Sequence, residues 1–261
     1  RIHTKRDDQT IPSISRGFSK MKPKTIISLY DYTGEALKPW AKEGYECIAF
    51  DIQHKMYENK KLHLAGGGSI LYIHADLYEF KILYRIYKKL KRKEQTIFGM
   101  AFPPCTDLAV SGAAHFKKKR EADPKFQSKA VHHVYQCRKM FEALKIPYFI
   151  ENPVSVLATK WRKPDYSFHP YEYGGYIPED EAEHPQWPEY IPARDAYRKK
   201  TCLWTGNGFR MPEKKEIDCS DYYGNGYSKP MMKLGGKSMR TKNIRSATPR
   251  GFAQAVMESN R

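Results

Sequence analysis

The sequence predicts an α/β fold in which a mostly parallel sheet is covered by helices on both faces. Short apolar segments alternate with segments of helical periodicity between residues 24 and 153, as is typical of strands joined by crossover helices. Polar motifs follow the ends of the apolar segments, and in parallel sheets the loops at these carboxyl ends hold the working residues. Beyond residue 153 the chain is rich in Pro, Tyr, Trp and Gly, and regular patterns become sparse.

The composition favours a folded, basic protein that binds a polyanion. Of the 261 residues, 46 are Lys or Arg and 29 are Asp or Glu, which gives a net charge of +17, and 40% are hydrophobic, enough for a core. This charge favours nucleic acid as the partner. No apolar run reaches the roughly 18–20 residues of a membrane span. Five cysteines without CxxC spacing disfavour a disulfide framework and a cysteine-rich zinc site. We expect a soluble, cytoplasmic, monomeric protein with no metal and no membrane partner.

The first elements are expected to be a strand, a helix and a second strand. A β-branched strand ends in the turn YDYTG, a helix follows over 35–44, and 45–51 is the second strand. After the glycine patch 66–68, a third strand is expected around 70–73, with Asp76 just beyond it. This order is the β-loop-α-β arrangement of a parallel sheet.

Two further helices and two strands are expected before residue 153. Segment 78–93 has apolar residues at helical spacing, so its many lysines form a solvated face. Segment 96–102 is a strand that runs directly into the tripeptide PPC. The period of 126–144 predicts a long helix, and 146–150 is a strand that ends at the tripeptide ENP.

We divide the chain into four parts. Residues 1–23 are a basic N-terminal arm, and 24–205 form the main α/β domain, with KTCLW as one further strand. Residues 206–243 are a small irregular appendage of glycine-punctuated loops, and 244–261 are a C-terminal helix that returns to the main domain.

The sharpest chemical signal is Cys105, which follows two prolines at the end of a buried strand. The prolines restrict the backbone and hold the next side chain rigidly at the edge of the sheet, which suits a nucleophile. Glu151 lies at the carboxyl end of its own strand, so the two side chains are expected to converge on one cleft. A cysteine nucleophile beside a proton-donating carboxyl group is what alkylation of cytosine at carbon 5 requires.

The requirement is electronic. Carbon 5 of cytosine is a poor nucleophile until a thiolate adds at carbon 6 and converts the ring into an enamine. A carboxyl group that protonates ring nitrogen 3, or holds a hydrogen bond to it, stabilises the charge that develops. The base must be extruded from a duplex before any of this can occur.

Six segments in order resemble the motif set of the DNA cytosine-5 methyltransferases, and among them the compact phage-type members. They are LYDYTG, FDIQH, FPPC, IENP, YRKKTCLW and RSATPRGFA. The resemblance covers about 24–205 and 244–261. It implies a Rossmann-like methyltransferase fold, S-adenosylmethionine as the cofactor, duplex DNA with a flipped cytosine as the partner, and the host cytoplasm as the location if a phage encodes the chain. It also implies Cys105 as nucleophile, Glu151 contacting nitrogen 3, and Arg198 or Lys200 steadying the base.

The resemblance implies a cofactor site at the ends of the first strands. The first turn wraps the methionine part, Asp51 binds the ribose hydroxyls as acids do in dinucleotide-binding folds, and Asp76 accepts from the adenine amino group. The cofactor-binding residues expected in this way are Tyr30, Tyr32, Thr33, Gly34, Asp51, Ile52, Asp76 and Pro103.

On the DNA side, the basic run 117–120 follows the catalytic loop and is expected to contact phosphates. The substrate-binding residues expected are Pro104, Asn152, Ser111, Lys117 and Lys118. Where the family keeps its target-recognition region, this chain has only 206–243, so we expect few contacts to base edges and a short or relaxed target of about two base pairs. The acidic stretch 179–183 is expected to face away from DNA.

Three alternatives stay open. An exocyclic amino methyltransferase has an acidic or amide residue before the two prolines and an aromatic residue after them, where this chain has Phe102 and Cys105. Cysteine chemistry on RNA or on a free nucleotide is the second. The third is a catalytically degenerate methyltransferase fold that only binds DNA, suggested by Tyr32 where the family usually has glycine.

Overall fold

The computed structural model describes residues 24–93, 95–220, 223–224, 227–228, 234 and 238–261. The predicted N-terminal arm, 1–23, and part of the predicted appendage, 206–243, therefore lie outside the described residues.

An eight-stranded sheet forms the centre of the molecule, in the order β3-β4-β2-β1-β5-β6-β8-β7. Five neighbouring strands are parallel: β1 (Thr25–Leu29), β2 (Glu46–Asp51), β4 (Ser69–His74), β5 (Thr96–Ala101) and β6 (Tyr148–Pro153). Three strands pair antiparallel with their neighbours: β3 (Lys60–His63) with β4, β8 (Thr201–Gly206) with β6, and β7 (Tyr166–Phe168) with β8.

The parallel strands are arranged in a doubly wound order. Numbered along the chain among themselves, they lie in the order 3-2-1-4-5, so the direction of winding reverses between β1 and β5. Ligands of such sheets bind outside the carboxyl ends of the strands at this switch point. The loops after β1 and β5 are therefore the first place to look for a site.

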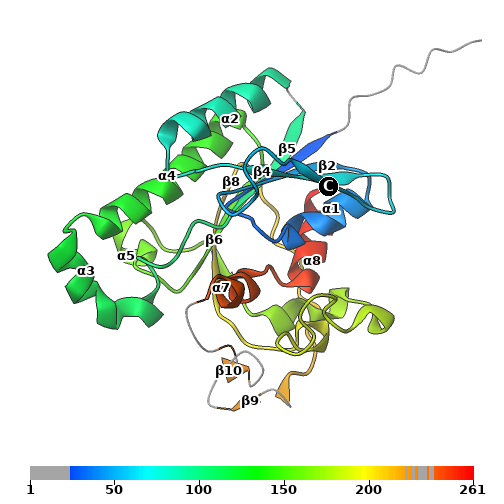
Figure 1. The fold of residues 1–261 in the computed structure, drawn as a ribbon. Helices are drawn as coiled ribbons and strands as arrows, with labels where there is room; N and C mark the ends of the chain where they lie inside the picture. Colours follow the sequence, from blue (N-terminus) through cyan, green and yellow to red (C-terminus); the bar gives the residue numbers. More distant parts are fainter. Residues whose placement is uncertain (1–23, 94, 221–222, 225–226, 229–233, 235–237) are drawn as a thin grey trace, which may run out of the picture.

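Helices cover both faces of the sheet (Figure 1). On one face lie α2 (Phe80–Lys93), α4 (Phe126–Leu144) and α5 (Leu157–Lys160), which bury apolar side chains against Ile27 and Ile150. On the other lie α1 (Lys38–Lys42), α8 (Arg250–Asn260) and the 3-10 segment η3 (Pro170–Tyr176), around Trp40, Phe98 and Phe252. Burial of large aromatic and branched side chains on both faces stabilises the sheet between its helical layers.

The remaining described elements are short. The 3-10 segments are η1 (Glu35–Leu37), η2 (Val110–His115), η4 (Glu179–Glu181) and η5 (Ala193–Asp195); the other helices are α3 (Phe116–Ala122) and α7 (Met239–Ser246), and β9 (Tyr223–Gly224) pairs with β10 (Tyr227–Ser228). Among the residues that the structure describes, we find no helix with the length and apolar character needed to span a bilayer.

The predicted α/β class, the mostly parallel sheet and the helices on both faces are confirmed. The predicted helix over 35–44 is split into η1 and α1, with Pro39 in the first turn of α1, and ends before Gly44, whose φ is +89°. The strand β3 has the sequence KKLH and was not expected, because mostly polar residues carry no strand pattern; it pairs at the sheet edge.

Candidate active site

The loop after β5 presents Cys105 at the carboxyl edge of the sheet. The carbonyl oxygen of Cys105 accepts hydrogen bonds from the backbone N–H groups of Leu108 (2.9 Å) and Ala109 (2.8 Å), so the chain turns sharply just after the cysteine. Pro103 is buried, Pro104 is exposed and the Cys105 side chain is half-buried. The thiol therefore stands on a fixed turn and not inside the core.

The loop after β6 is joined to this turn. The side chain of Asn152, which is 1% exposed, donates from Nδ2 to the carbonyl oxygen of Pro103 at 2.9 Å. Beyond it, the Val110 N–H donates to the Val154 carbonyl (3.0 Å) and the Val156 N–H to the Leu108 carbonyl (2.9 Å). The PPC and ENP segments, far apart in sequence, thus form one connected structure.

Glu151 belongs to the same corner, and its charge acts on the cysteine. Burial raises the pKa of Glu151, and Lys199 opposes that rise. The pKa of the Cys105 thiol is also raised, by burial first and by the Glu151 charge second, while Lys199 lowers it. The three ionisable groups therefore form one electrostatically coupled cluster.

Lys199 lies two residues before β8, and the pairing of β8 with β6 brings this segment close to Glu151. Glu151 pairs with Leu203 in the antiparallel ladder of β6 and β8. Residues two apart on a strand share a face, and Lys199, together with Thr201, lines a small pocket with Glu151. The Lys199 Nζ donates to the carbonyl oxygen of Arg245 at 2.6 Å, which anchors its far end.

The pocket at Glu151 is nearly closed. Its volume is about 10 Å³, the space of about one water molecule. Phe102 and Phe168 form part of the wall, and the segment 246–249, which joins α7 to α8, forms another part. The pocket is therefore too small for a six-membered ring in this arrangement of the chain.

A second corner lies after β1, where a buried carboxylate organises the turn. Asp31 is 4% exposed; its Oδ2 accepts from the Ser28 hydroxyl (2.8 Å), and its Oδ1 accepts from the Gly34 N–H (2.7 Å) and the Thr33 hydroxyl (3.4 Å). Burial raises the pKa of Asp31, although the hydrogen bonds from Gly34 and Ser28 oppose the rise.

The expected cofactor residues of this turn are distributed around Asp31. Tyr30 has a φ of +58°, a backbone conformation that costs energy for a tyrosine, and its hydroxyl donates to the Leu77 carbonyl at 3.1 Å. Tyr32 is half-exposed, with its ring stacked 5.6 Å from that of His54. Gly34 has a φ of +69°, and a Cβ there would lie 2.6 Å from the Tyr72 hydroxyl oxygen. The positive φ and the nearness of the Tyr72 ring both favour glycine at this position.

Asp51 and Asp76 end their strands as expected. Asp51 is buried at the last position of β2 and accepts from the Gln53 N–H at 2.8 Å; burial raises its pKa. Ile52 is exposed beside it. Asp76, two residues after β4, is half-buried and accepts from the Tyr78 N–H at 3.0 Å. Both carboxylates thus lie at the edge of the sheet that carries Cys105.

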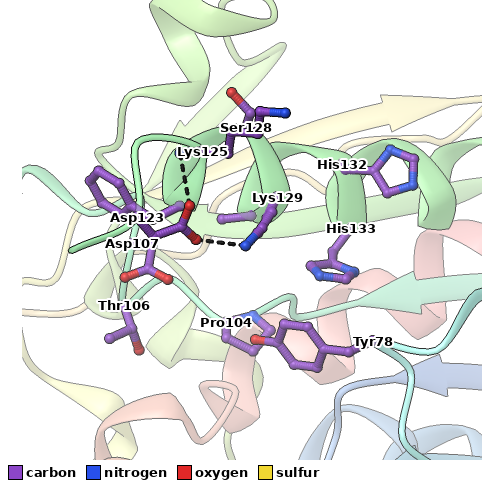
Figure 2. A pocket seen from close by; sticks show the side chains of 12 residues that line it. Tyr78, Pro104, Thr106, Asp107, Asp123, Lys125, Ser128, Lys129, His132 and His133 are labelled. Atoms are coloured by element: carbon purple, nitrogen blue, oxygen red, sulfur yellow. Dashed lines mark hydrogen bonds and ion pairs between the residues drawn. The ribbon is translucent and has the colours of Figure 1, made fainter. Parts of the chain in front are cut away.

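A cleft of about 640 Å³ opens between the loop after β5 and the start of α4, a size typical of ligand sites. Figure 2 shows its lining: Tyr78 and Pro104 lie near His133, and Asp123 binds Lys129 on the opposite side. The Tyr78 and His133 rings are 4.1 Å apart, edge to face. These aromatic walls suit a planar ring.

The other site residues expected from the sequence are exposed and lie on η2, on α3 and just before β8. Ser111 is exposed in η2, and Lys117 and Lys118 are exposed in α3. Arg198 is exposed, with its guanidinium 5.7 Å from the Tyr171 ring centre, and Lys200 is exposed just before β8. Neither lines the pocket at Glu151, where the structure brings Lys199 instead.

Asp31 and Lys199 were not among the expected site residues, and Lys119 was expected only as part of the run 117–120 that contacts phosphates. Asp31 was readable from its spacing, since an Asp three residues before a glycine often closes a turn. Lys199 follows from strand alternation counted back from Leu203, once the register of β8 is known. Lys119 donates to the Thr106 carbonyl (2.9 Å) and to Asp107 (2.6 Å), which ties α3 to the turn of Cys105.

No model of a known protein family matches the chain. A comparison with curated proteins also finds no match.

Proposed function

We propose that this protein is an S-adenosylmethionine-dependent DNA cytosine carbon-5 methyltransferase that attaches its target base covalently to Cys105. The observation that carries the proposal is the hydrogen bond from Asn152 to Pro103. It joins the PPC and ENP segments and sets Glu151 within electrostatic reach of the thiol. A thiol and a protonatable carboxyl group at neighbouring strand ends are the two groups that the reaction needs.

The residues present fit the cofactor that the resemblance implies. Asp51 and Asp76 offer carboxylate oxygens, which suit ribose hydroxyls and an amino group, and the adjoining cleft has aromatic walls at Tyr78 and His133. When bound, S-adenosylmethionine supplies an electrophilic methyl group on a sulfonium. The doubly wound sheet is compatible with the methyltransferase fold implied by the resemblance.

The chemistry of the chain centres on the coupling of Cys105 and Glu151. A raised thiol pKa keeps Cys105 protonated in the free protein, and the thiol proton has to leave to solvent as sulfur bonds to carbon 6. A raised carboxyl pKa makes protonation of Glu151 easier, and the protonated carboxyl group can donate its proton to ring nitrogen 3. A neutral Glu151 also removes the charge that opposes the thiolate. Loss of the carbon-5 proton to a water molecule and expulsion of Cys105 as a thiolate later restore the ring, and the nitrogen-3 proton returns to the Glu151 carboxylate.

Charge supports DNA as the substrate class. The net charge is +17, and Lys117, Lys118 and Arg120 stand exposed on α3, which Lys119 ties to the turn of Cys105. Lysines and arginines at this position are suited to phosphates beside the extruded base. The short interval 206–243 leads to the further proposal that the target is short or relaxed. A strict target of four or more base pairs, found by sequencing a methylated library, would refute that second part.

The test is covalent trapping. A duplex containing 5-fluorocytosine cannot lose the group at carbon 5, so the protein with S-adenosylmethionine should form a stable adduct whose tryptic peptide carries Cys105. Cys105→Ala should form none and should produce no 5-methylcytosine by nucleoside mass spectrometry, whereas Cys137→Ala, on the buried side of α4, should still trap. Near-normal methylation by Cys105→Ala would sink the mechanism.

The same assay separates the remaining alternatives. Competition with RNA or with dCMP should not prevent trapping if duplex DNA is the substrate. A module that only binds DNA would show no heat on calorimetric titration with S-adenosylmethionine, and it would bind the fluorinated duplex without any adduct.

A further inference from the structure

The helix α2 carries a row of aromatic rings on its surface. Phe80 is 59% exposed and Tyr84 is 48% exposed, and their rings are stacked with centres 6.0 Å apart. The Tyr87 ring, half-buried, lies 6.2 Å from that of Tyr84. Positions 80, 84 and 87 fall on one side of a helix because they are four and three residues apart. Large apolar rings that stay open to water in this way mark an interaction site.

Cations border the rings. The Lys88 Nζ lies 5.6 Å from the centre of the Tyr84 ring, and the Lys91 Nζ lies 5.6 Å from that of Tyr87. The α2 stripe is defined here as Phe80, Tyr84, Tyr87, Lys88 and Lys91. It extends about 16 Å along the helix axis, with its three rings toward the start of α2 and its two cations toward the end.

The rest of α2 is strongly basic. Its sequence, FKILYRIYKKLKRK, has seven Lys and Arg residues and no acid, and all seven are exposed. The acid Glu79 comes just before the helix. The core-facing side uses Leu83 and Leu90, which pack with α4 on the sheet (Figure 1). Tyr87 packs partly against the same core, but the exposed rings of Phe80 and Tyr84 are not part of it. The charge of the stripe suits a polyanion.

The stripe begins at the rim of the cleft beside Cys105. Tyr78 lines that cleft, and α2 starts two residues later at Phe80. A chain that leaves the candidate active site on this side meets the exposed rings and then the cations of α2.

We propose that the α2 stripe is a binding surface for single-stranded nucleic acid, on which bases stack over Phe80 and Tyr84 while the neighbouring cations hold the phosphates. Exposed rings combined with cations are how proteins bind single strands without sequence preference, because every base has a flat face. A duplex shields its base faces and can use only the cations. This surface goes beyond the proposed methylation and does not depend on it.

The test compares ring contacts with charge contacts. The probes are a fluorescein-labelled oligothymidylate of about ten nucleotides, an abasic strand of the same length, and a duplex, each titrated with the full chain by fluorescence anisotropy. The double variant Phe80→Ala/Tyr84→Ala should bind the oligothymidylate about tenfold or more weakly. Its binding to the abasic strand and to the duplex should be unchanged, and its salt dependence should be preserved because every cation remains.

Matched variants separate the roles. Tyr84→Phe keeps the ring and should bind as the wild type does, while Tyr57→Ala removes a ring that is 96% exposed in the loop before β3 and should also have no effect. Lys88→Gln/Lys91→Gln should weaken all three probes and flatten their salt dependence. If the double variant does not fold, Tyr84→Ala against Tyr84→Phe gives the same comparison.

Three results would overturn the proposal. They are unchanged oligothymidylate binding by a folded ring variant, an equal loss for the abasic strand, or a loss seen only with vesicles containing phosphatidylserine, which would assign the stripe to a membrane surface. Cys105→Ala should keep wild-type oligothymidylate binding, so failure of the methylation proposal and failure of this one are distinguishable.

Discussion

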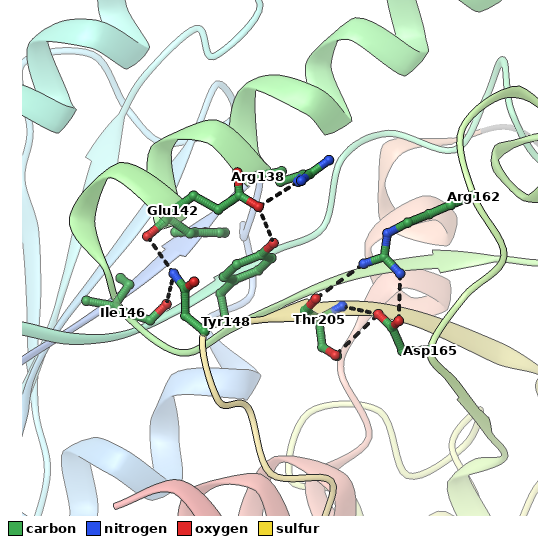
Figure 3. A network of polar contacts seen from close by, with 9 residues as sticks. Arg138, Glu142, Ile146, Tyr148, Arg162, Asp165 and Thr205 are labelled. Atoms are coloured by element: carbon green, nitrogen blue, oxygen red, sulfur yellow. Dashed lines mark hydrogen bonds and ion pairs between the residues drawn. The ribbon is translucent and has the colours of Figure 1, made fainter.

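At the end of the sheet where β6 begins and β8 ends, carboxylates are paired with arginines (Figure 3). At the opposite end of the sheet, the carboxylates are buried and have few cations near them. Arg138 binds Glu142 at 2.7 Å and Arg162 binds Asp165 at 2.6 Å. Burial raises the pKa of Asp165, but the hydrogen bonds from Arg162 and from the Thr205 N–H (2.7 Å) bring it below its ordinary value.

At the carboxyl end, the pKa values move in the opposite direction. Burial raises the pKa values of Asp31, Asp51 and Glu151, and the local hydrogen bonds and Lys199 do not cancel that effect. Paired carboxylates contribute to holding elements together, while buried carboxylates with raised pKa values cost stability and are kept where they bind or react. The buried carboxylates with raised pKa values thus lie at the end of the strands that carries the candidate active site.

The largest difference in effect is expected between substitutions of two asparagines, Asn152 at the carboxyl end of β6 and Asn207 at the opposite end of the sheet. Asn152→Ala removes the donor to the buried Pro103 carbonyl, which should cost about 2 kcal/mol of unfolding free energy and abolish methylation, since the turn of Cys105 loses its anchor. At the other end, Asn207 donates to the carbonyls of Phe141 (3.2 Å) and Ile146 (3.0 Å). Asn207→Gly keeps its left-handed backbone accessible and should cost about 1 kcal/mol without changing methylation per folded molecule.

Urea unfolding and methylation assays on both variants provide the measurement. Full activity in Asn152→Ala would show that the PPC and ENP segments keep their arrangement without this hydrogen bond, and the comparison of the two ends would fail.

Two glycines give the next effect. Gly34 and Gly208 have φ values of +69° and +83°, but a Cβ would meet the Tyr72 hydroxyl at Gly34 and nothing within 4 Å at Gly208. Gly208→Ala should therefore show only the backbone cost, about 1 kcal/mol. Gly34→Ala should cost about 1–3 kcal/mol more because of the clash, and Tyr72→Phe should relieve part of that excess. Equal costs at the two positions, by thermal unfolding, would mean that the turn after β1 adjusts freely.

The sequence indicates the loops after β5 and β6, which carry Cys105 and Glu151, far more clearly than the turn after β1, which carries Asp31. PPC and ENP stand out because two prolines before a cysteine and a carboxylate at a strand end are chemically distinctive, and both lie in the corner that the structure forms. The parallel strands and long helices were equally readable from their periodicity.

The basic partner of Glu151 was not readable. Arg198 and Lys200 were expected from the resemblance, yet Lys199 lines the pocket, because the side that each residue of this segment faces depends on how β8 pairs with β6. A one-residue change of register would exchange these faces, and no local pattern in YRKKT specifies it. The spacing of Asp31 from Gly34 indicates a turn, but the burial of Asp31 could not be predicted, since it depends on how the turn packs against Phe50 and His54.

The pH dependence of stability should differ in sign between the ends. The folded-state pKa of Asp31 is raised, so its contribution to stability is complete below the unfolded pKa and is lost as pH rises through the folded value. The folded-state pKa of Asp165 is lowered, so its contribution is present above the unfolded pKa and is lost as pH falls through the folded value. A folded pKa that differs by one pH unit from the unfolded pKa changes stability by about 1.4 kcal/mol at most, and solvent screening reduces this at the partly exposed Asp165.

The matched substitutions Asp31→Asn and Asp165→Asn test this. Asp31→Asn should gain stability relative to wild type as pH rises from about 4 to 7, because the amide stays neutral and the Ser28 hydroxyl can turn to accept from it. Asp165→Asn should lose about 1 kcal/mol or less at pH 7 and approach wild type in acid. The measurement is the free energy of unfolding of each variant at both pH values. If the two variants changed in the same direction relative to wild type, the opposite pKa shifts of Asp31 and Asp165 would be contradicted.

The smallest expected effect concerns the reactivity of the Cys105 thiol. The Glu151 charge raises its pKa and the Lys199 charge lowers it. At pH 8, Glu151→Gln should therefore speed alkylation of Cys105 by iodoacetamide severalfold and Lys199→Gln should slow it, by about tenfold at most if the thiol pKa moves by one pH unit. Arg162→Gln, at the far end of the sheet, should change nothing. Peptide mass spectrometry across a pH series separates a displaced titration curve from a change in access. If both site variants moved the rate in the same direction without displacing the curve, steric opening of the nearly closed pocket, and not charge, would control the thiol.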